Sequence, residues 1–148
     1  MRKYTVNDNY NFETHNGAWL LGFIAADGYL PNTRGAANRV IITLARQDEN
    51  VLELIKQEIG YSGPLYQFDA TGGYPSSSLS FTSSLIRRAI EGYGIGNNKT
   101  FNLLSIPNLP EELIMDFIRG FFDGDGSLYE PKGKKINMSF TCASKPFL

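Results

Sequence analysis

The sequence has little cysteine, no long apolar run and almost no net charge, and each shortage narrows the class of protein. Cys142 is the only cysteine among 148 residues, which excludes an intrachain disulfide framework and favours a reducing interior. No apolar run approaches the roughly 18 residues of a membrane span, so no membrane partner is expected. Residues 1–8 lack the hydrophobic core of a signal peptide, so we expect an intracellular protein, cytoplasmic or organellar.

The charge balance neither favours nor excludes a nucleic-acid partner. The formal net charge is −1 and the isoelectric point is near 5.8, whereas DNA-binding domains are usually basic. Most acids, however, lie on predicted helices, and many bases lie on predicted strands and loops. One face of a sheet can therefore be positive on a nearly neutral protein. The 42% of hydrophobic residues are enough for a sizeable core in a single domain.

Two stretches of the sequence repeat each other. Residues 20–28 read LLGFIAADG and residues 118–126 read IRGFFDGDG, 98 residues later. Each is a short apolar helical run with a central glycine, and each ends in Asp-Gly. An aspartate in the last turn of a helix faces the negative end of the macrodipole, which costs up to about 1 kcal/mol. Two such aspartates at matched positions, Asp27 and Asp125, indicate that both carboxylates are needed at one place.

Hydrophobic periodicity around the first stretch predicts a mixed α+β order. The expected elements are a helix over 17–27, strands over 29–34 and 38–46, a helix over 49–59, strands over 65–70 and 77–82, and a helix over 84–93. Arg87 and Arg88 are expected on a solvated face of the last of these helices. From Glu111 the pattern restarts with a helix to Asp125 and strands near 127–129 and 136–142.

The repeat predicts four parts of the chain. They are an N-terminal extension (1–16), a first repeat (17–93), a linker (94–110) and the start of a second repeat (111–148). The second copy ends where its second helix would begin, so it is incomplete and we expect a fragment of a longer protein.

The two glycines of the repeated stretches predict how the helices meet. Gly22 and Gly120 hold equivalent positions, and small residues let two helix backbones approach closely. If the helices pack there, Asp27 and Asp125 project from the same end. Two carboxylates about 5 Å apart repel by about 3 kcal/mol at an effective dielectric constant of 20, so a divalent cation is expected between or beside them. Oxygen-only ligation favours Mg²⁺, with Mn²⁺ as an alternative.

These two stretches resemble the LAGLIDADG homing endonucleases, in their two-motif, single-chain form. The resemblance implies an αββαββα repeat with an antiparallel, DNA-facing sheet, followed here by a partial second repeat. It implies a site-specific, often intron-associated hydrolase that cuts duplex DNA with a divalent metal, monomeric in its full-length form with two pseudo-symmetric repeats. The last acid of each motif, here Asp27 and Asp125, would bind the metal, assisted by the carbonyls of Ala26 and Gly124.

The resemblance also implies roles outside the motifs. Lys99, in an Asn-Lys-Thr context, would stabilise negative charge in the transition state, and Gln47 would help to order the nucleophilic water. Strand faces and hairpin loops would contact DNA, although an ordinary solvated sheet face would show the same alternation. The candidate DNA-contacting residues are Arg34, Arg39, Ile41, Thr43, Arg46, Ser78, Ser80, Lys132, Lys134, Asn137, Ser139 and Thr141.

Three other functions fit the same sequence. A non-cleaving DNA-binding regulator and an RNA-splicing maturase would keep the scaffold without cutting, although a pure binder gains nothing from paired carboxylates at helix ends. The third is an inactive remnant, which the incomplete second repeat favours.

Overall fold

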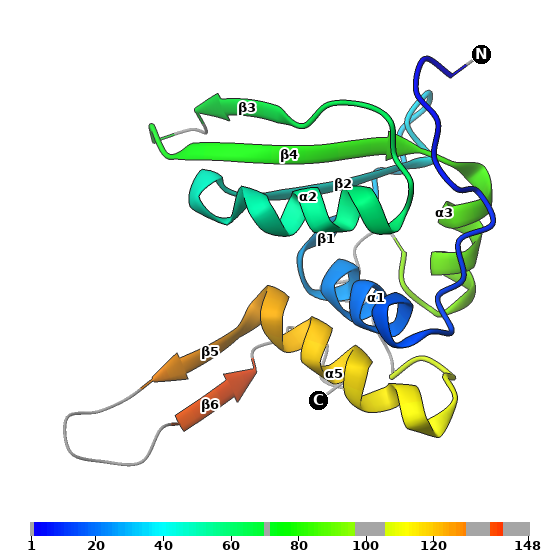
Figure 1. Cartoon of the computed structure of the whole chain (residues 1–148), viewed down its shortest axis with the longest axis vertical. Helices are drawn as coiled ribbons and strands as arrows, with labels where there is room; N and C mark the ends of the chain where they lie inside the picture. The colour runs from blue at the N-terminus through cyan, green and yellow to red at the C-terminus, as the bar shows by residue number, and fades with distance from the viewer. Residues whose placement is uncertain (1, 70–71, 97–105, 130–136, 141–148) are drawn as a thin grey trace. The chain divides into compact units, whose positions relative to one another are not determined.

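The computed structural model, shown in Figure 1, describes residues 2–69, 72–96, 106–129 and 137–140. The chain divides into two compact units. The first unit contains residues 1–11 and 28–92, and the second contains residues 12–27 and 93–148. No helix in the described part of the chain is long and apolar enough to cross a membrane.

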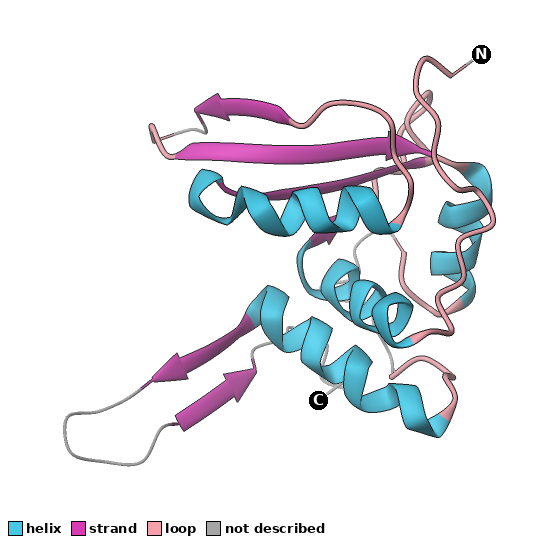
Figure 2. Ribbon diagram, viewed as in Figure 1, coloured by secondary structure: helices cyan, strands magenta, loops and turns pink. Residues whose placement is uncertain are grey.

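The first unit is an antiparallel sheet with helix α2 against one face (Figure 2). Its strands lie in the spatial order β1-β2-β4-β3 and are β1 (Gly28–Tyr29), β2 (Arg39–Ala45), β3 (Tyr66–Asp69) and β4 (Pro75–Thr82). Its helices are the short 3-10 helix η1 (Arg46–Asp48), α2 (Glu49–Glu58) and α3 (Ser84–Gly92). Helix α1 (His15–Asp27) precedes these elements in the sequence, so the order along the chain is the predicted αββαββα. The predicted α+β class is therefore confirmed.

Alternation along the central strands separates the two faces of the sheet. Val40 and Ile42 are fully buried, whereas Arg39 and Thr43 are exposed. The register with β4 continues the pattern, because buried Phe81 lies opposite Val40. Side chains of a strand alternate between faces with a period of two, so the apolar residues gather on one face and the polar residues on the other.

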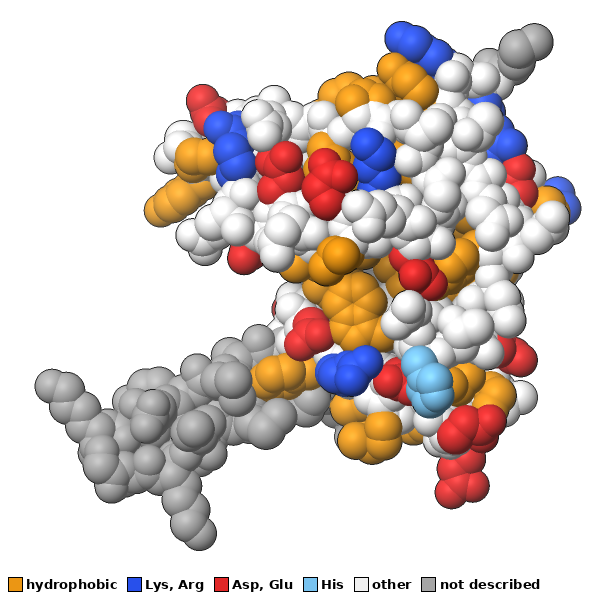
Figure 3. All heavy atoms as spheres, viewed as in Figure 1, with side chains coloured by type: hydrophobic (Ala, Val, Ile, Leu, Met, Phe, Trp, Pro, Cys, Tyr) orange, Lys and Arg blue, Asp and Glu red, His pale blue; other side chains and the backbone are white. Residues whose placement is uncertain are grey.

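Helix α2 covers the apolar face of this sheet. Its Leu52 and Ile55 are buried, as expected for one side of an amphipathic helix. Glu49, in its first turn, accepts hydrogen bonds from Ser77 Oγ (2.6 Å) and from Gln67 Nε2 (2.8 Å). The bond from Ser77, followed by the one from Gln67, lowers the pKa of the Glu49 carboxyl. The outer side of α2 carries acidic and basic side chains (Figure 3). Because α2 packs on the apolar face, the polar face of the sheet is the one that α2 leaves uncovered.

The first strand is shorter than predicted. We expected it to span residues 29–34, but β1 ends at Tyr29. Pro31 has no N–H to donate to a strand ladder. The carbonyl oxygens of Leu30 and Pro31 instead accept hydrogen bonds from the two terminal nitrogens of Arg87, at 3.2 and 2.9 Å. The chain therefore leaves the sheet after two residues.

The prediction of a solvated face is wrong for Arg87. Its side chain is only 3% exposed, and besides the two carbonyls above it bonds the carbonyl oxygen of Arg39 (2.9 Å) and the carboxylate of Glu91 (2.8 Å). The neighbouring Arg88 is exposed, as predicted. Arg87 thus ties α3 to β2 and to the segment that follows β1.

The second unit is built on two helices that lie side by side, α1 and α5 (Glu111–Asp125) (Figure 1). Helix α5 has the bounds predicted from the sequence. A hairpin follows it, formed by β5 (Gly126–Tyr129) and β6 (Asn137–Phe140), which pair antiparallel. Each of the two helices therefore runs directly from its last aspartate into a strand, α1 into β1 and α5 into β5.

We predict that Arg87→Ala lowers the free energy of unfolding by about 3 kcal/mol, because it leaves two buried carbonyl oxygens and one part-buried carbonyl oxygen without their charged donor. Urea denaturation followed by circular dichroism measures the change. Arg88→Ala, one residue away on the exposed side of the same helix, is the matched control and should change stability by less than about 0.5 kcal/mol. Equal losses in the two variants would contradict a structural role for Arg87.

Candidate functional site

Two glycines allow α1 and α5 to pack backbone against backbone. A Cβ atom on Gly22 would overlap the carbonyl oxygen of Phe117 and lie 2.8 Å from the amide nitrogen of Phe121. A Cβ atom on Gly120 would overlap the carbonyl oxygen of Trp19 and lie 2.7 Å from its carbonyl carbon. Any other residue at either position would force the helices apart, so the close approach requires glycine at both.

The contacts of the two glycines are reciprocal. Gly120 follows Gly22 by 98 residues, and Phe117 follows Trp19 by the same 98 residues. Each motif glycine therefore contacts the carbonyl group of the equivalent position on the other helix. Such reciprocity, in which one position contacts a second and the second contacts the first, is the property of a two-fold arrangement. The two helices are related by a local two-fold axis.

The axis passes close to the C-terminal ends of both helices. A Cβ atom on Gly124 would lie 2.7 Å from the Cβ of Ala26, and these two residues are themselves equivalent. It would also lie 3.5 Å from the Cβ of Asp27. Asp27 and Asp125 are the last residues of α1 and α5, and both are exposed. The two acids therefore lie at the same end of the helix pair, one from each side of the axis.

One difference between the motifs has a structural explanation. The sixth motif position is Ala25 in α1 and Asp123 in α5. Asp123 Oδ2 accepts a hydrogen bond from the indole Nε1 of Trp19 (2.7 Å), and the Trp19 ring stacks on Phe23 with centroids 5.1 Å apart. The acid at this position thus contacts the other helix, a role that the sequence did not reveal.

A charged cluster joins the N-terminal half of the same interface. His15, the first residue of α1, places its Nδ1 2.6 Å from Asp116 Oδ2 on α5. Arg119 donates to the other oxygen of the same carboxylate at 3.1 Å. The His15–Asp116 and Trp19–Asp123 contacts thus join α1 to α5, whereas the bond of Arg119 lies within α5.

The donor atoms at the end of the helix pair fit a hard divalent cation. Both candidate side chains are carboxylates, and each sits against the negative end of its own helix, which disfavours uncompensated negative charge. Carboxylate and carbonyl oxygens are the ligands that Mg²⁺ prefers. Within the described residues, no group of three or more His, Cys, Asp or Glu side chains is placed to hold a metal ion. That Asp27, Asp125 and the carbonyls of Ala26 and Gly124 hold a cation stays a prediction.

The predicted DNA-contacting rows of the first unit come together on the uncovered face of its sheet. The register pairs Arg39 with Thr82, Ile41 with Ser80, and Thr43 with Ser78. Ser78 is only 7% exposed and accepts a hydrogen bond from Thr43 Oγ1 (3.1 Å), so its hydroxyl is less accessible than the sequence suggested. Tyr66 of β3 lies opposite Ser78 and extends the same face, with half of its surface exposed.

Three further predicted residues lie at the ends of these strands. Arg34 is exposed in the segment between β1 and β2. Arg46 donates from one terminal nitrogen to the carbonyl oxygens of Phe68 (3.2 Å) and Ser76 (3.4 Å), so part of its hydrogen-bonding capacity is used within the sheet. Gln47 is exposed in η1 and lines an open cavity of about 450 Å³ beside Arg46. The proposed role of Gln47 stays a prediction.

Other predicted site residues fall where no side chain is described. Asn137 and Ser139 belong to β6, where only the backbone is described. The residues that lie outside the described ranges are Lys99, Lys132, Lys134 and Thr141.

Comparison with protein families agrees with this geometry. The family model described as a LAGLIDADG-like domain matches residues 112–148, which include α5 from its second residue, together with strands β5 and β6. Residues 112–148 belong to a LAGLIDADG-like domain. LAGLIDADG domains are those of homing-endonuclease-type nucleases and their relatives, which bind double-stranded DNA. None of the curated proteins compared with the chain matches it significantly. The resemblance inferred from the repeated motifs is thereby confirmed for the second motif, which lies in α5; helix α1, with the first motif, lies outside the matched residues.

We predict that Gly22→Ala lowers the free energy of unfolding by about 2 kcal/mol or more, because its methyl group cannot enter the contact with Phe117. Urea denaturation measures the loss. Gly92→Ala in α3, where an added Cβ would meet nothing within 4 Å, is the control and should be neutral or stabilising. A Gly22→Ala variant as stable as the control would mean that α1 and α5 do not pack through this glycine.

Proposed function

We propose that the chain is a metal-dependent endonuclease that hydrolyses phosphodiester bonds of duplex DNA at a specific site. The observation that carries the proposal is the reciprocal packing of α1 and α5. This packing brings the two motif acids, Asp27 and Asp125, to one end of the helix pair. Gly22 and Gly120 permit the close approach of the two helices, and the acids are the last residues of those helices.

The two acids would act by holding cations where the scissile phosphates lie. Bound Mg²⁺, or Mn²⁺ in its place, would supply Lewis-acid stabilisation of charge on the phosphate and a lowered pKa for bound water. The carboxylates of Asp27 and Asp125 would fix the cation position, and the carbonyls of Ala26 and Gly124 would complete the protein ligands. A local two-fold axis between the acids suits a duplex, since its two strands run in opposite directions.

The uncovered face of the first sheet would supply binding to DNA. Arg39, Thr43, Ser80 and their neighbours present short polar groups and a guanidinium on a face that α2 leaves open. Such a ribbon of alternating polar side chains suits the major groove, where base edges differ in their donors and acceptors. Specific recognition would therefore come from the sheet, and cleavage from the helix ends.

We predict that Asp27→Asn and Asp125→Asn each reduce DNA cleavage by at least about 100-fold, because each removes a charged cation ligand from the reaction centre. The substrate is a plasmid library with a randomised insert, incubated with Mg²⁺ or with EDTA, and new ends are identified by sequencing. Wild-type cleavage should require Mg²⁺ and give ends at one preferred sequence.

Asp123→Asn is the matched control for this experiment, because the asparagine oxygen can still accept the bond from Trp19. It should keep most of the wild-type activity. Undiminished cleavage in both Asp27→Asn and Asp125→Asn would contradict the catalytic role of these two acids. DNA binding without cleavage in the wild type would instead favour the non-cleaving DNA-binding function.

A further inference from the structure

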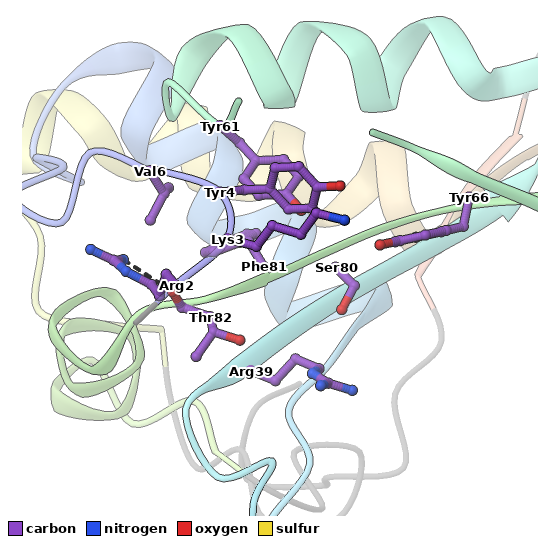
Figure 4. A pocket seen from close by; sticks show the side chains of 10 residues that line it. All are labelled: Arg2, Lys3, Tyr4, Val6, Arg39, Tyr61, Tyr66, Ser80, Phe81 and Thr82. Carbon is purple, nitrogen blue, oxygen red and sulfur yellow. Dashed lines mark hydrogen bonds between the residues drawn. The ribbon is translucent and has the colours of Figure 1, made fainter. Parts of the chain in front are cut away.

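A cavity of about 460 Å³ lies at one end of the sheet of the first unit (Figure 4). β3 pairs with β4 only as far as Tyr66 opposite Ser78, so the rest of β4, residues 79–82, extends beyond the end of β3. The N-terminal segment, residues 2–6, lies beside this part of β4, where Arg2 donates to the carbonyl oxygen of Thr82 (3.1 Å). Residues far apart in the sequence thus surround one space.

The cavity has an unusual charge for this chain. Its lining includes the three basic residues Arg2, Lys3 and Arg39 and no acidic residue, although the whole chain has 15 acids and 14 bases. The guanidinium of Arg2 is neutralised by Asp8, to which both terminal nitrogens donate, at 2.8 and 2.5 Å. This pairing, reinforced by a bond from Ser83, lowers the pKa of the Asp8 carboxyl.

Lys3 and Arg39 keep their charge available to a ligand. Both residues are exposed, and neither forms a salt bridge with a carboxylate of the described residues. The Lys3 ammonium lies 5.3 Å from the centre of the Tyr4 ring, and that ring packs edge-on against buried Tyr61. The aromatic pair therefore lies beside the charged end of the lysine, at the wall of the cavity.

The remaining lining suits a sugar–phosphate unit. Ser80 and Thr82 offer hydroxyl donors from β4, and Tyr66 offers an aromatic surface that is 51% exposed. Arg39 and Ser80 also belong to the uncovered sheet face described above, so the cavity continues that face beyond its end. Cationic side chains and the hydroxyl groups of Ser, Thr and Tyr are the groups that bind nucleic-acid backbones.

We propose that this cavity holds a backbone phosphate of the bound DNA duplex, with Lys3 and Arg39 as its charged ligands. The N-terminal segment is then part of the DNA interface, and the interface is longer than the strands alone. This inference rests on the proposed function, because the phosphate belongs to the DNA duplex that the protein is proposed to cleave.

The experiment measures binding of the 148-residue chain to a labelled random-sequence duplex of about 30 base pairs, by fluorescence anisotropy, between about 50 and 200 mM KCl. For Lys3→Gln, we expect weaker binding and a shallower slope of log K against log[KCl]; in the double variant with Arg39→Gln the slope should become shallower by about 0.9, the value for one lost phosphate contact. Arg39→Gln should weaken binding similarly. The double variant should lose less than the sum of the two single losses, because both residues bind one phosphate.

Lys56→Gln is the control, since Lys56 lies on α2 against the opposite face of the sheet, and its slope should equal that of the wild type. If Lys3→Gln behaves like Lys56→Gln while Arg39→Gln weakens binding, the cavity proposal is overturned and the proposed function stands. Additive losses in the double variant would overturn the shared phosphate. A wild-type chain that does not bind the duplex would overturn both.

Discussion

The structure depends on the backbone contact between two helices that begin almost 100 residues apart in the sequence. Gly22 contacts the carbonyl of Phe117, and Gly120 contacts the carbonyl of Trp19. Each helix therefore contributes one glycine and one carbonyl group at equivalent positions. Neither contact tolerates a side chain. Because the contacts are reciprocal, they fix the rotation and the register of both helices together, and the residues at the helix ends follow from them.

The same contact explains why two acids occupy positions that a helix disfavours. Asp27 and Asp125 each lie at the negative end of a macrodipole, and the packing brings their helix ends together. A fold selected for stability alone would place a cation or glycine there. The proposed divalent cation would offset both the dipole and the mutual repulsion of the carboxylates.

Much of this could be predicted from the sequence because the signals are local. Apolar periodicity gave the bounds of α5, and alternation along β2 gave the face that Arg39 and Thr43 share. The predictions failed where a distant group competes with a local preference. Residues 30–34 were expected to continue the first strand, but Pro31 cannot donate to a ladder and Arg87 takes the carbonyls of Leu30 and Pro31; no local pattern marks that arginine as buried.

In the candidate site, too, local signals were predicted from the sequence and contacts between distant residues were not. The repeated Asp-Gly endings and glycines identified the helix pair from the sequence alone. The bond between Trp19 and Asp123, and the pairing of His15 with Asp116, depend on which side chains face each other across the interface. The contribution of residues 2–6 to a cavity also escaped prediction, although the basic and aromatic run Arg2-Lys3-Tyr4 is a short signal of this kind.

The central claim is that Asp27 and Asp125 form one cation site, and the most direct measurement is thermal unfolding with and without Mg²⁺. A ligand that binds only the folded state raises the melting temperature, and the rise increases with ligand concentration relative to Kd. The account predicts that Mg²⁺ raises the melting temperature of the wild type by a few degrees and that Asp27→Asn and Asp125→Asn each abolish most of the rise, while Asp123→Asn keeps it. A wild type that does not respond, or a rise that survives in either Asp27→Asn or Asp125→Asn, would contradict it.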